Sequence, residues 1–532
     1  MLAKPPVDDY PKNPRIDIVH YRFDLAFSDA DDTLRATATI SARYIVGGDS
    51  TLRLDLIQPN AARQGRGMTV ESVRAGDRLL AYSHSGDVLL IQLGHRATPG
   101  ELVRVRIAYH GAPAGALAFG PNKYGDRTIF SDNWPNKARN WLPTVDHPYD
   151  KATSEMVVTA PSHYQVVSNG LRIEETDLGG GMRRTHWQQS VPIATWLYTL
   201  GVAEFAVQRV GTCQGVAIET WVYAQDRDAG FHDFQEPTCD VMQFYRNRVG
   251  PYAYEKLANV VSATVSGGME AASAIMYGEP SVSGTRAINW QNVIAHELAH
   301  QWFGNAVTEG DWDDVWLSEG FATYFTLLYR EHARGRDDFV SGLKQSRETI
   351  AKFYATTPDY RVVHDGLRDM SQVTNGMTYQ KGAWTLHMLR NLIGDDAYWR
   401  GIQAYYREHF NGNASTADFQ RAMEEASGQS LGSFFDQWLR QGGIPAFRAV
   451  LGADRRSGNA TVTLIPEPSE YRFIVPVEYA IELADGSTTR GRVVITSGPP
   501  ITIPVQVSSP TRALIIDPDT KLLARWAVES GP

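Results

Sequence analysis

The hydrophobic and polar positions of the first 200 residues alternate as in β-strands that have one face in water. From Ala36 to Val46 the even positions are apolar and most odd positions are polar, and this period of two sends successive side chains to opposite faces of a sheet. Residues 52–56 and 103–109 repeat the pattern, and turn-forming clusters such as residues 47–50 separate the strands. We therefore predict a large antiparallel β-sheet domain over residues 1–203.

The middle of the chain has the period of a helix instead. Between Asn289 and Gln441 apolar residues recur three and four positions apart, which is the spacing of one helix face. This spacing predicts helices in and around residues 293–302, 321–329, 379–392, 398–409 and 416–427, with Ser415 or Thr416 as the N-cap of the last. We predict a mainly helical domain over residues 204–441.

The last part of the chain returns to alternation. Residues 473–483 alternate between two faces, and Asp485-Gly486 closes the run as a turn. Pro476 lacks an N–H for a sheet hydrogen bond, so it places this strand at a sheet edge or at a bulge. The segment 442–445, Gly-Gly-Ile-Pro, reads as a hinge. We predict a small C-terminal β domain over residues 442–532, which makes three domains in all.

Composition restricts the partners of the chain. The 532 residues carry 51 Lys and Arg against 60 Asp and Glu, a net charge of −9, and they contain no block of basic residues. This composition argues against nucleic acid as the main partner. The longest apolar stretch, residues 191–203, is too short for a membrane span and contains Pro192. We expect a soluble protein without membrane insertion, cytoplasmic as the sequence stands, or periplasmic or secreted if a signal peptide has been removed. The oligomeric state stays open.

Only two cysteines occur, Cys213 and Cys239. Two cysteines exclude a disulfide framework and any metal site that needs three or four thiolates. Two buried thiols are the favoured interpretation, and a single disulfide is the alternative.

The segment 296–300, His-Glu-Leu-Ala-His, carries the clearest chemistry. Residues four apart lie on one face of a helix, so His296 and His300 would converge on one ion with Glu297 beside them. Two imidazoles suit Zn²⁺, which needs a third ligand and an open position in a catalytic site. The alternative interpretation is a helix whose two histidines are satisfied by polar neighbours.

A candidate third ligand follows His300 after 18 intervening residues. The stretch 316–324 begins a second apolar-periodic helix with Glu319 in its first turn. A carboxylate there is ordinarily favoured by the helix dipole alone. Beside His296 and His300, however, Glu319 would complete a set of two histidines and one glutamate.

These residues resemble the zinc pattern of the M1 family of metallopeptidases, the gluzincin aminopeptidases. Gly267-Gly268-Met269-Glu270 resembles the family's exopeptidase motif, commonly written Gly-Ala-Met-Glu-Asn, and the segment 377–382, Met-Thr-Tyr-Gln-Lys-Gly, resembles the stretch with its catalytic tyrosine. The resemblance spans nearly the whole chain. It implies an α+β protein with a β-rich N-terminal domain, a thermolysin-like catalytic domain and a C-terminal β-sandwich.

The resemblance also implies a role for each motif residue. His296, His300 and Glu319 would bind one zinc ion per chain, Glu297 would be the general base, and Tyr379 would donate a hydrogen bond to the oxyanion. Glu270 would bind the free α-ammonium of a peptide substrate. The backbone of Gly267 and Gly268 would line the peptide like a short strand, and Met269 is a candidate for the pocket of its first residue. Without this role, Gly267-Gly268 would be a simple turn, Glu270 a surface acid and Tyr379 a packing residue.

The chain departs from the family pattern in three places. Ala271 replaces the asparagine of the exopeptidase motif. Where relatives supply a second polar group to the substrate amine this chain has Trp134, so Asn133 or Asp132 would substitute or the aromatic ring would shape the pocket. Only about 90 residues follow Gly443, too few for the large C-terminal helical domain of many relatives.

We predict a zinc aminopeptidase that acts on peptides with a free N-terminus. Three alternatives remain open. One is an epoxide hydrolase of the same family, the second an endopeptidase, and the third an inactive peptide-binding module with a relict zinc site.

Overall fold

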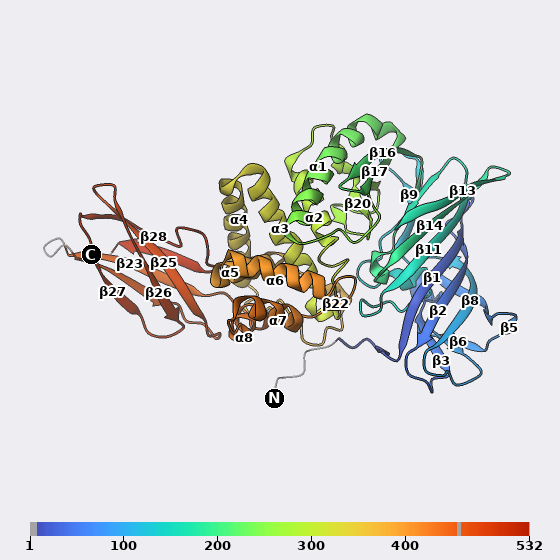
Figure 1. Ribbon diagram of the computed structural model, residues 1–532, viewed down its shortest axis with the longest axis horizontal. Coiled ribbons are helices and arrows are strands. Elements are labelled where there is room, and N and C mark those ends of the chain that lie inside the picture. The colour runs from blue at the N-terminus through green and yellow to red at the C-terminus, as the bar shows by residue number, and fades with distance from the viewer. Residues whose placement is uncertain (1–7, 455–458, 531–532) are drawn as a thin grey trace. The chain divides into compact units, whose positions relative to one another are not determined.

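The computed structural model describes residues 8–454 and 459–530 (Figure 1). These residues form two compact units. The first unit contains the described residues up to Ser318 together with 365–373 and 403–416. The second contains 319–364, 374–402 and the described residues from 417 onward. The domain boundaries predicted at residues 203 and 441 mark a change between strands and helices, whereas these units are defined by their internal contacts. The predicted boundaries therefore stay predictions.

The first unit begins with the predicted β domain, whose main sheet has eight strands in the order β13-β14-β11-β1-β2-β8-β4-β5 (Figure 1). Its strands are β1 (Ile16–Ala26), β2 (Leu34–Tyr44), β4 (Gly67–Ala75), β5 (Arg78–Leu79), β8 (Glu101–Ala112), β11 (Ala152–Pro161), β13 (Leu171–Gly179) and β14 (Met182–Ile193). The predicted antiparallel pairing is correct except between β1 and β11, which run parallel. On β2 the alternation seen in the sequence becomes a buried face with Ala38, Ile40 and Ala42.

Smaller sheets complete the β part of this unit. Three strands pair in the order β3-β7-β6, four in the order β12-β15-β10-β9 and five in the order β16-β17-β18-β20-β19. Their bounds are β3 (Thr51–Asp55), β6 (Tyr82–Ser85), β7 (Val88–Gln92), β9 (Leu117–Pro121), β10 (Arg127–Ser131), β12 (Gln165–Ser168), β15 (Leu200–Ala203), β16 (Phe205–Cys213), β17 (Val216–Tyr223), β18 (Lys256–Ser262), β19 (Gly268–Met269) and β20 (Ala274–Gly278). The two-stranded pair β21 (Thr308–Glu309) and β22 (Asn413–Ala414) is parallel.

Two helices of the first unit pack beside the five-stranded sheet, α1 (Arg227–Arg248) and α2 (Ile288–His300) (Figure 1). Helix α2 is the helix predicted around the two histidines. Helix α1 was not predicted, and Pro237 lies inside it. A proline interrupts helical hydrogen bonding, which is why the sequence signal was weak there.

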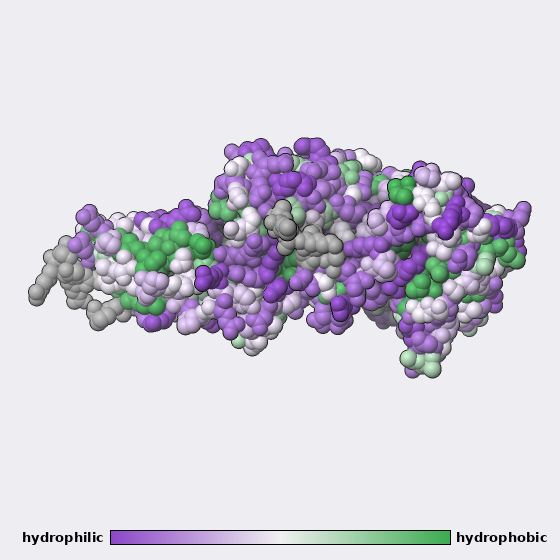
Figure 2. Space-filling view, turned by 90° about the horizontal axis from the view of Figure 1, so that it is seen from below, coloured by the Kyte–Doolittle hydropathy of each residue, from purple (hydrophilic) through white to green (hydrophobic). Residues whose placement is uncertain are grey.

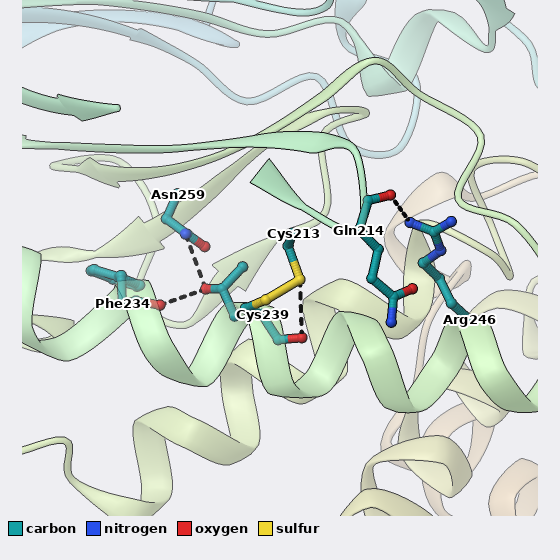
Figure 3. The surroundings of a disulfide bond; sticks show 7 residues. Cys213, Gln214, Phe234, Cys239, Arg246 and Asn259 are labelled. Atoms are coloured by element: carbon teal, nitrogen blue, oxygen red, sulfur yellow. Dashed lines mark hydrogen bonds between the residues drawn. A yellow bond between two sulfur atoms is a disulfide. The ribbon is translucent and has the colours of Figure 1, made fainter. Parts of the chain in front are cut away.

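A disulfide joins Cys213 at the end of β16 to Cys239 on α1 (Figure 3). The favoured interpretation of two buried thiols was therefore wrong, because pairing depends on the packing of α1 against the β16–β17 hairpin, which the spacing of two cysteines does not reveal. Arg246, further along α1, donates to the carbonyl oxygen of Gln214 at 2.7 Å (Figure 3). The disulfide and this hydrogen bond hold the helix against the hairpin.

Reduction of this disulfide is expected to lower the stability of the first unit. Closing a loop of 26 residues removes about 3.5 kcal/mol of conformational entropy from the unfolded chain in the chain-entropy description. Thermal melting with and without a reductant measures the effect as a drop of several degrees. Cys213→Ser and Cys239→Ser should each melt at the lower temperature and show no further response to reductant. Equal melting of oxidised and reduced wild-type protein would contradict the prediction.

The second unit is helical in its first part. Its helices are α3 (Trp316–Arg334), α4 (Arg336–Tyr354), α5 (Gly376–Ile393), α6 (Asp395–Glu408), α7 (Thr416–Ser427) and α8 (Gly432–Phe435). The first three residues of α3, the last part of α6 and the first residue of α7 belong to the first unit. Helix α5 begins with a capping box, in which the Asn375 side chain accepts from the backbone of the first turn and Thr378 bonds back to the backbone N–H of Asn375. Helix α4 was not predicted, whereas the other long helices match the predicted segments.

Two sheets form the C-terminal β part, in the orders β27-β24-β23-β29 and β26-β25-β28. The strands are β23 (Ala446–Asp454), β24 (Asn459–Pro466), β25 (Ile474–Leu483), β26 (Thr488–Thr496), β27 (Ile501–Gln506), β28 (Thr511–Ile516) and β29 (Arg525–Ser530). The edge position predicted from Pro476 was wrong for β25 as a whole, which is the central strand of its sheet. Pro476 itself pairs only with Val494 of β26, because pairing with β28 starts at Tyr479, so no sheet hydrogen bond is lost.

No large helical domain follows Gln441 among the described residues. Apolar surface gathers on the C-terminal strands, at the left of Figure 2, and their most exposed large apolar side chains include Ile474, Val494 and Val528. Within the described residues, every helix is too short or too polar to span a lipid bilayer.

Candidate functional site

The two histidines of α2 face each other at the end of the helix. Their Nε2 atoms lie 3.1 Å apart, and their ring planes are nearly perpendicular. Ile294, Ala295 and Leu298 bury the other side of the same turns. His300 is 1% exposed. The helical spacing thus brings two imidazole nitrogens to one point.

The other ring nitrogen of His300 is held by its surroundings. Its Nδ1 lies 2.9 Å from the Ser318 hydroxyl and 3.2 Å from the carbonyl oxygen of Phe303. Gly304 permits this approach, because it has a φ of +114° and a Cβ on it would overlap the Ser318 hydroxyl. Ser318 was not among the predicted residues. Its position directly before Glu319, a candidate ligand, is a sequence signal that could have pointed to it.

Glu297, between the two histidines, is 5% exposed. Its carboxylate packs against strand β19, where a Cβ on Gly268 would lie within 3.0 Å of the glutamate side chain. Burial and the Glu297 carboxylate together raise the pKa of the Tyr277 hydroxyl on β20 well above the ordinary value for tyrosine. Gly268 of the predicted motif therefore gives Glu297 the space it occupies.

Glu270 follows β19 and is 6% exposed. One carboxylate oxygen lies 3.9 Å from His300 Nδ1, and ligand atoms of Glu270, Glu297 and His300 all lie within 4.8 Å of one another. Three of the predicted site residues are thus gathered in the first unit. Buried carboxylates next to imidazoles are a usual feature of metal and catalytic sites.

Strand β19 is the edge of the five-stranded sheet. Gly268 pairs with Tyr277 and Met269 with Met276 on one side, and β19 ends the strand order on the other. Gly267 lies directly before the strand. An edge strand offers its backbone N–H and C=O groups to an added extended segment. The motif residues Gly268 and Met269 thus form the last strand of this sheet.

In the second unit, Tyr379 and Glu319 meet. The Tyr379 hydroxyl, on α5, donates a hydrogen bond to Glu319 Oε1 on α3 at 2.7 Å. Glu319 is 4% exposed. Helix α3 continues from Ser318 to Glu319 without interruption, so Glu319 directly follows the residue that touches His300 in the first unit.

The residues around Trp134 contact other side chains and backbone groups of the same unit. Asn133 is 1% exposed, and its side chain donates to the carbonyl oxygen of Tyr198 at 2.7 Å and accepts from the Trp141 indole at 2.9 Å. Asp132 accepts from the backbone N–H of Trp134 at 3.2 Å. The Trp134 ring lies edge-on to Trp196 and Trp312, with centroids 4.7 and 5.3 Å away. Asn133 is thus held by buried neighbours, whereas Asp132 and Trp134 are half-buried.

Models of known protein families match two parts of the chain. A model described as the peptidase family M1 domain matches residues 235–438, and one described as the peptidase M1 N-terminal domain matches residues 18–197. Aminopeptidase A of Gloydius brevicauda is 29% identical over 390 residues, which is 68% of this chain and 40% of that protein. Human glutamyl aminopeptidase is 30% identical over 341 residues, 60% of this chain and 34% of that protein. The chain spans about 40% or less of the length of these curated relatives.

Solved structures share the fold. An M1 zinc metallopeptidase from Deinococcus radiodurans, crystallised as a mutant with a Tyr-Ser-Ala substrate, matches with a TM-score of 0.69 at 24% identity. The match covers 80% of this chain and 94% of that one. A mutant described as a two-domain M1 zinc metallopeptidase bound to L-tryptophan matches equally well, with a TM-score of 0.69 at 25% identity over the same shares.

Proposed function

We propose, since this chain belongs to peptidase family M1, that it is a zinc-dependent aminopeptidase which removes the first residue of peptides with a free N-terminus. The observation that carries the proposal is the facing pair His296 and His300 with the buried Glu297 between them. If this helix served only for packing, there would be no reason for two imidazoles and two carboxylates to lie together at its end.

The histidine pair fits a zinc ion. Two Zn–N bonds of about 2.0–2.1 Å at a tetrahedral angle place the nitrogens roughly 3.3 Å apart, against 3.1 Å here. Glu319 is the proposed third ligand, since it follows Ser318 on one helix and accepts a hydrogen bond from Tyr379. When bound, zinc would polarise the scissile carbonyl and lower the pKa of a bound water to about 7.

The chain's own residues would do the remaining chemistry. Glu297 would take a proton from the attacking water and return it to the leaving amine, because a buried carboxylate at this point is a base in reach of both. Tyr379 would donate its hydroxyl proton in a hydrogen bond to the oxyanion, a type of contact that is stronger in the transition state than in the substrate.

Selection of the N-terminus would rest on Glu270. Its buried carboxylate would pair with the α-ammonium of the substrate, while β19, the last strand of its sheet, would pair with the peptide backbone. An internal peptide segment would place an uncharged group against Glu270 and leave the buried charge poorly compensated. Asn133 is engaged elsewhere, so Trp134, Met269 and Tyr277 are the candidates for the pocket of the first side chain.

Ser318 is expected to strengthen metal binding. Its hydroxyl fixes the ring of His300 through Nδ1 at 2.9 Å and leaves Nε2 directed at His296. Loss of such a contact typically costs 10–100-fold in metal affinity. Ser318→Ala should weaken zinc binding by that factor in a chelator competition. Ser346→Ala, at a serine buried in α4, is the matched control and should bind zinc as the wild type does. Equal affinity for all three proteins would remove the role of Ser318.

The Cys213–Cys239 disulfide favours an oxidising compartment, such as a periplasm or the outside of the cell. Of the compartments predicted from the sequence, we therefore propose the periplasmic or secreted one. Counting free thiols in protein isolated from its natural source tests this. Two free thiols per chain would point to the cytoplasm.

A panel of fluorogenic aminoacyl amides, assayed with and without a zinc chelator, tests the function. Release of the fluorophore that stops with chelator and returns with zinc is the expected result. The panel should include glutamyl and tyrosyl amides, because curated relatives are named glutamyl aminopeptidase and a solved relative holds Tyr-Ser-Ala. N-acetylated versions should not react.

The alternatives have their own outcomes in the same set of assays. Cleavage of N-terminally blocked peptides would indicate an endopeptidase. Turnover of a lipid epoxide without peptide cleavage would indicate an epoxide hydrolase. Tight peptide binding without turnover by zinc-loaded protein would indicate a binding module.

A further inference from the structure

Helix α2 is followed by two amide side chains that hold the loop of Glu270. Gln301 Nε2 donates to the backbone carbonyl oxygen of Glu270 at 3.0 Å, and Gln301 Oε1 accepts from the backbone N–H of Ser273 at 3.0 Å. Asn305 Nδ2 donates to the same carbonyl oxygen of Glu270 at 2.6 Å. Gln301 and Asn305 are both 0% exposed. We call these two residues the amide clamp.

The loop that the clamp holds has a constrained backbone. Ser273 has a φ of +62°, a left-handed conformation that residues other than glycine, asparagine and aspartate rarely adopt. Further bonds secure the far end of the loop, from Asn169 Nδ2 to the carbonyl oxygen of Ala272 at 2.7 Å and from Lys256 Nζ to that of Ser273 at 3.1 Å. The amide clamp acts at the near end, on the backbone of Glu270 itself.

The clamp and a proposed metal ligand are neighbours in the chain. Gln301 directly follows His300, and the Glu270 carboxylate lies 3.9 Å from His300 Nδ1. Buried hydrogen bonds of fixed geometry therefore connect the helix end that would hold zinc to the backbone of the residue that would hold the substrate amine. A displacement of about 1 Å between such groups is enough to cost roughly 100-fold in rate.

We propose that Gln301 and Asn305 position Glu270 at a set distance from the metal-binding histidines, and that this distance restricts cleavage to the first peptide bond. The inference rests on the proposed aminopeptidase function. The recognised group is the free α-ammonium of a peptide, one residue away from the bond that is cut. The clamp touches neither substrate nor metal, so Gln301 and Asn305 are positioning residues.

Gln301→Met tests the proposal, because methionine has nearly the same size and provides neither hydrogen bond. We expect KM for aminoacyl amides to rise about tenfold with a smaller change in kcat, and the preference for free over N-acetylated substrates to fall about tenfold. Zinc affinity, measured by chelator competition, should stay within about twofold of wild type. Asn305→Ala should shift KM and the preference in the same direction.

Gln291→Met is the matched control. Gln291 lies on α2, the helix that Gln301 follows, and its side chain also donates to a backbone carbonyl, that of Arg286, at 2.7 Å. This variant should keep the wild-type KM and the wild-type preference. If Gln301→Met does not fold, Asn305→Ala carries the test, since it removes one donor to the Glu270 carbonyl oxygen and leaves the bond between Gln301 and Ser273 in place. The same shifts are expected from it.

Two results would overturn the proposal. One is a zinc-loaded Gln301 variant with wild-type KM and preference, even if its melting temperature is lower, because a purely structural role predicts that outcome. The other is a loss of zinc affinity with unchanged KM, which would assign the clamp to the metal instead. Absence of aminopeptidase activity in the wild type would remove the proposed function before any variant is compared.

Discussion

Glu297→Gln is expected to lower kcat for aminoacyl amides by about 10²–10⁴-fold, the usual contribution of a general base. Glutamine has the shape of glutamate but does not accept a proton from water at neutral pH. Glu297 is buried between His296 and His300 and packs against Gly268, so the amide should occupy the same space. Zinc content and KM should therefore stay near the wild-type values, and steady-state kinetics with metal analysis measures all three quantities.

The control for this experiment is Glu236→Gln on α1. The Glu236 side chain is 72% exposed and pairs with Arg286, so its neutralisation should leave kcat within about twofold. A Glu297→Gln enzyme that is fully zinc-loaded and retains more than a tenth of the wild-type kcat would assign the base to another group. Glu270, with a carboxylate in the same cluster, would be the first to test.

Tyr379→Phe is expected to lower kcat by about 10²–10³-fold, because removal of one oxyanion donor costs about 3–4 kcal/mol of transition-state stabilisation. The hydroxyl lies 2.7 Å from Glu319 Oε1, which places it beside the proposed third ligand. KM should change little, since the proposed contact to the oxyanion would form only in the transition state. Comparing kcat with KM for one good substrate separates the two effects.

Tyr360→Phe is the matched control, because Tyr360 shares a hydrogen bond of 3.3 Å with Thr378, the residue before Tyr379. It should keep the wild-type kcat within about twofold. If Tyr379→Phe instead raises KM and leaves kcat unchanged, the hydroxyl binds substrate in its ground state and does not stabilise the oxyanion.

The helix of the two proposed metal ligands could be predicted because its signal is local. The spacing of His296 and His300 alone puts both rings on one face, and the structure has their Nε2 atoms 3.1 Å apart. Ser318, Gln301 and Asn305 were not predicted, because the sequence does not indicate which group a serine, glutamine or asparagine side chain will bond to. Their hydrogen bonds to His300 and to the Glu270 loop exist only once the chain has folded.

In the fold, too, local features could be predicted and features that depend on distant partners could not. Strands such as β2 were predicted from alternation, which reports one buried face and needs no knowledge of the partner strand. The parallel pairing of β1 with β11 was missed, because the choice of neighbour is set by topology and not by pattern. Helix α1 was missed at Pro237, where tertiary contacts, including the disulfide to β16, outweigh the local preference.

The joining of Cys213 to Cys239 has a practical consequence for labelling. These are the only cysteines of the chain, so the oxidised protein offers no thiol to maleimide dyes. A cysteine introduced at Ile288, the first residue of α2 and 60% exposed, would be the single reactive site. A fluorophore there would let rapid mixing follow events on the helix of His296 and His300, with both native cysteines left in place.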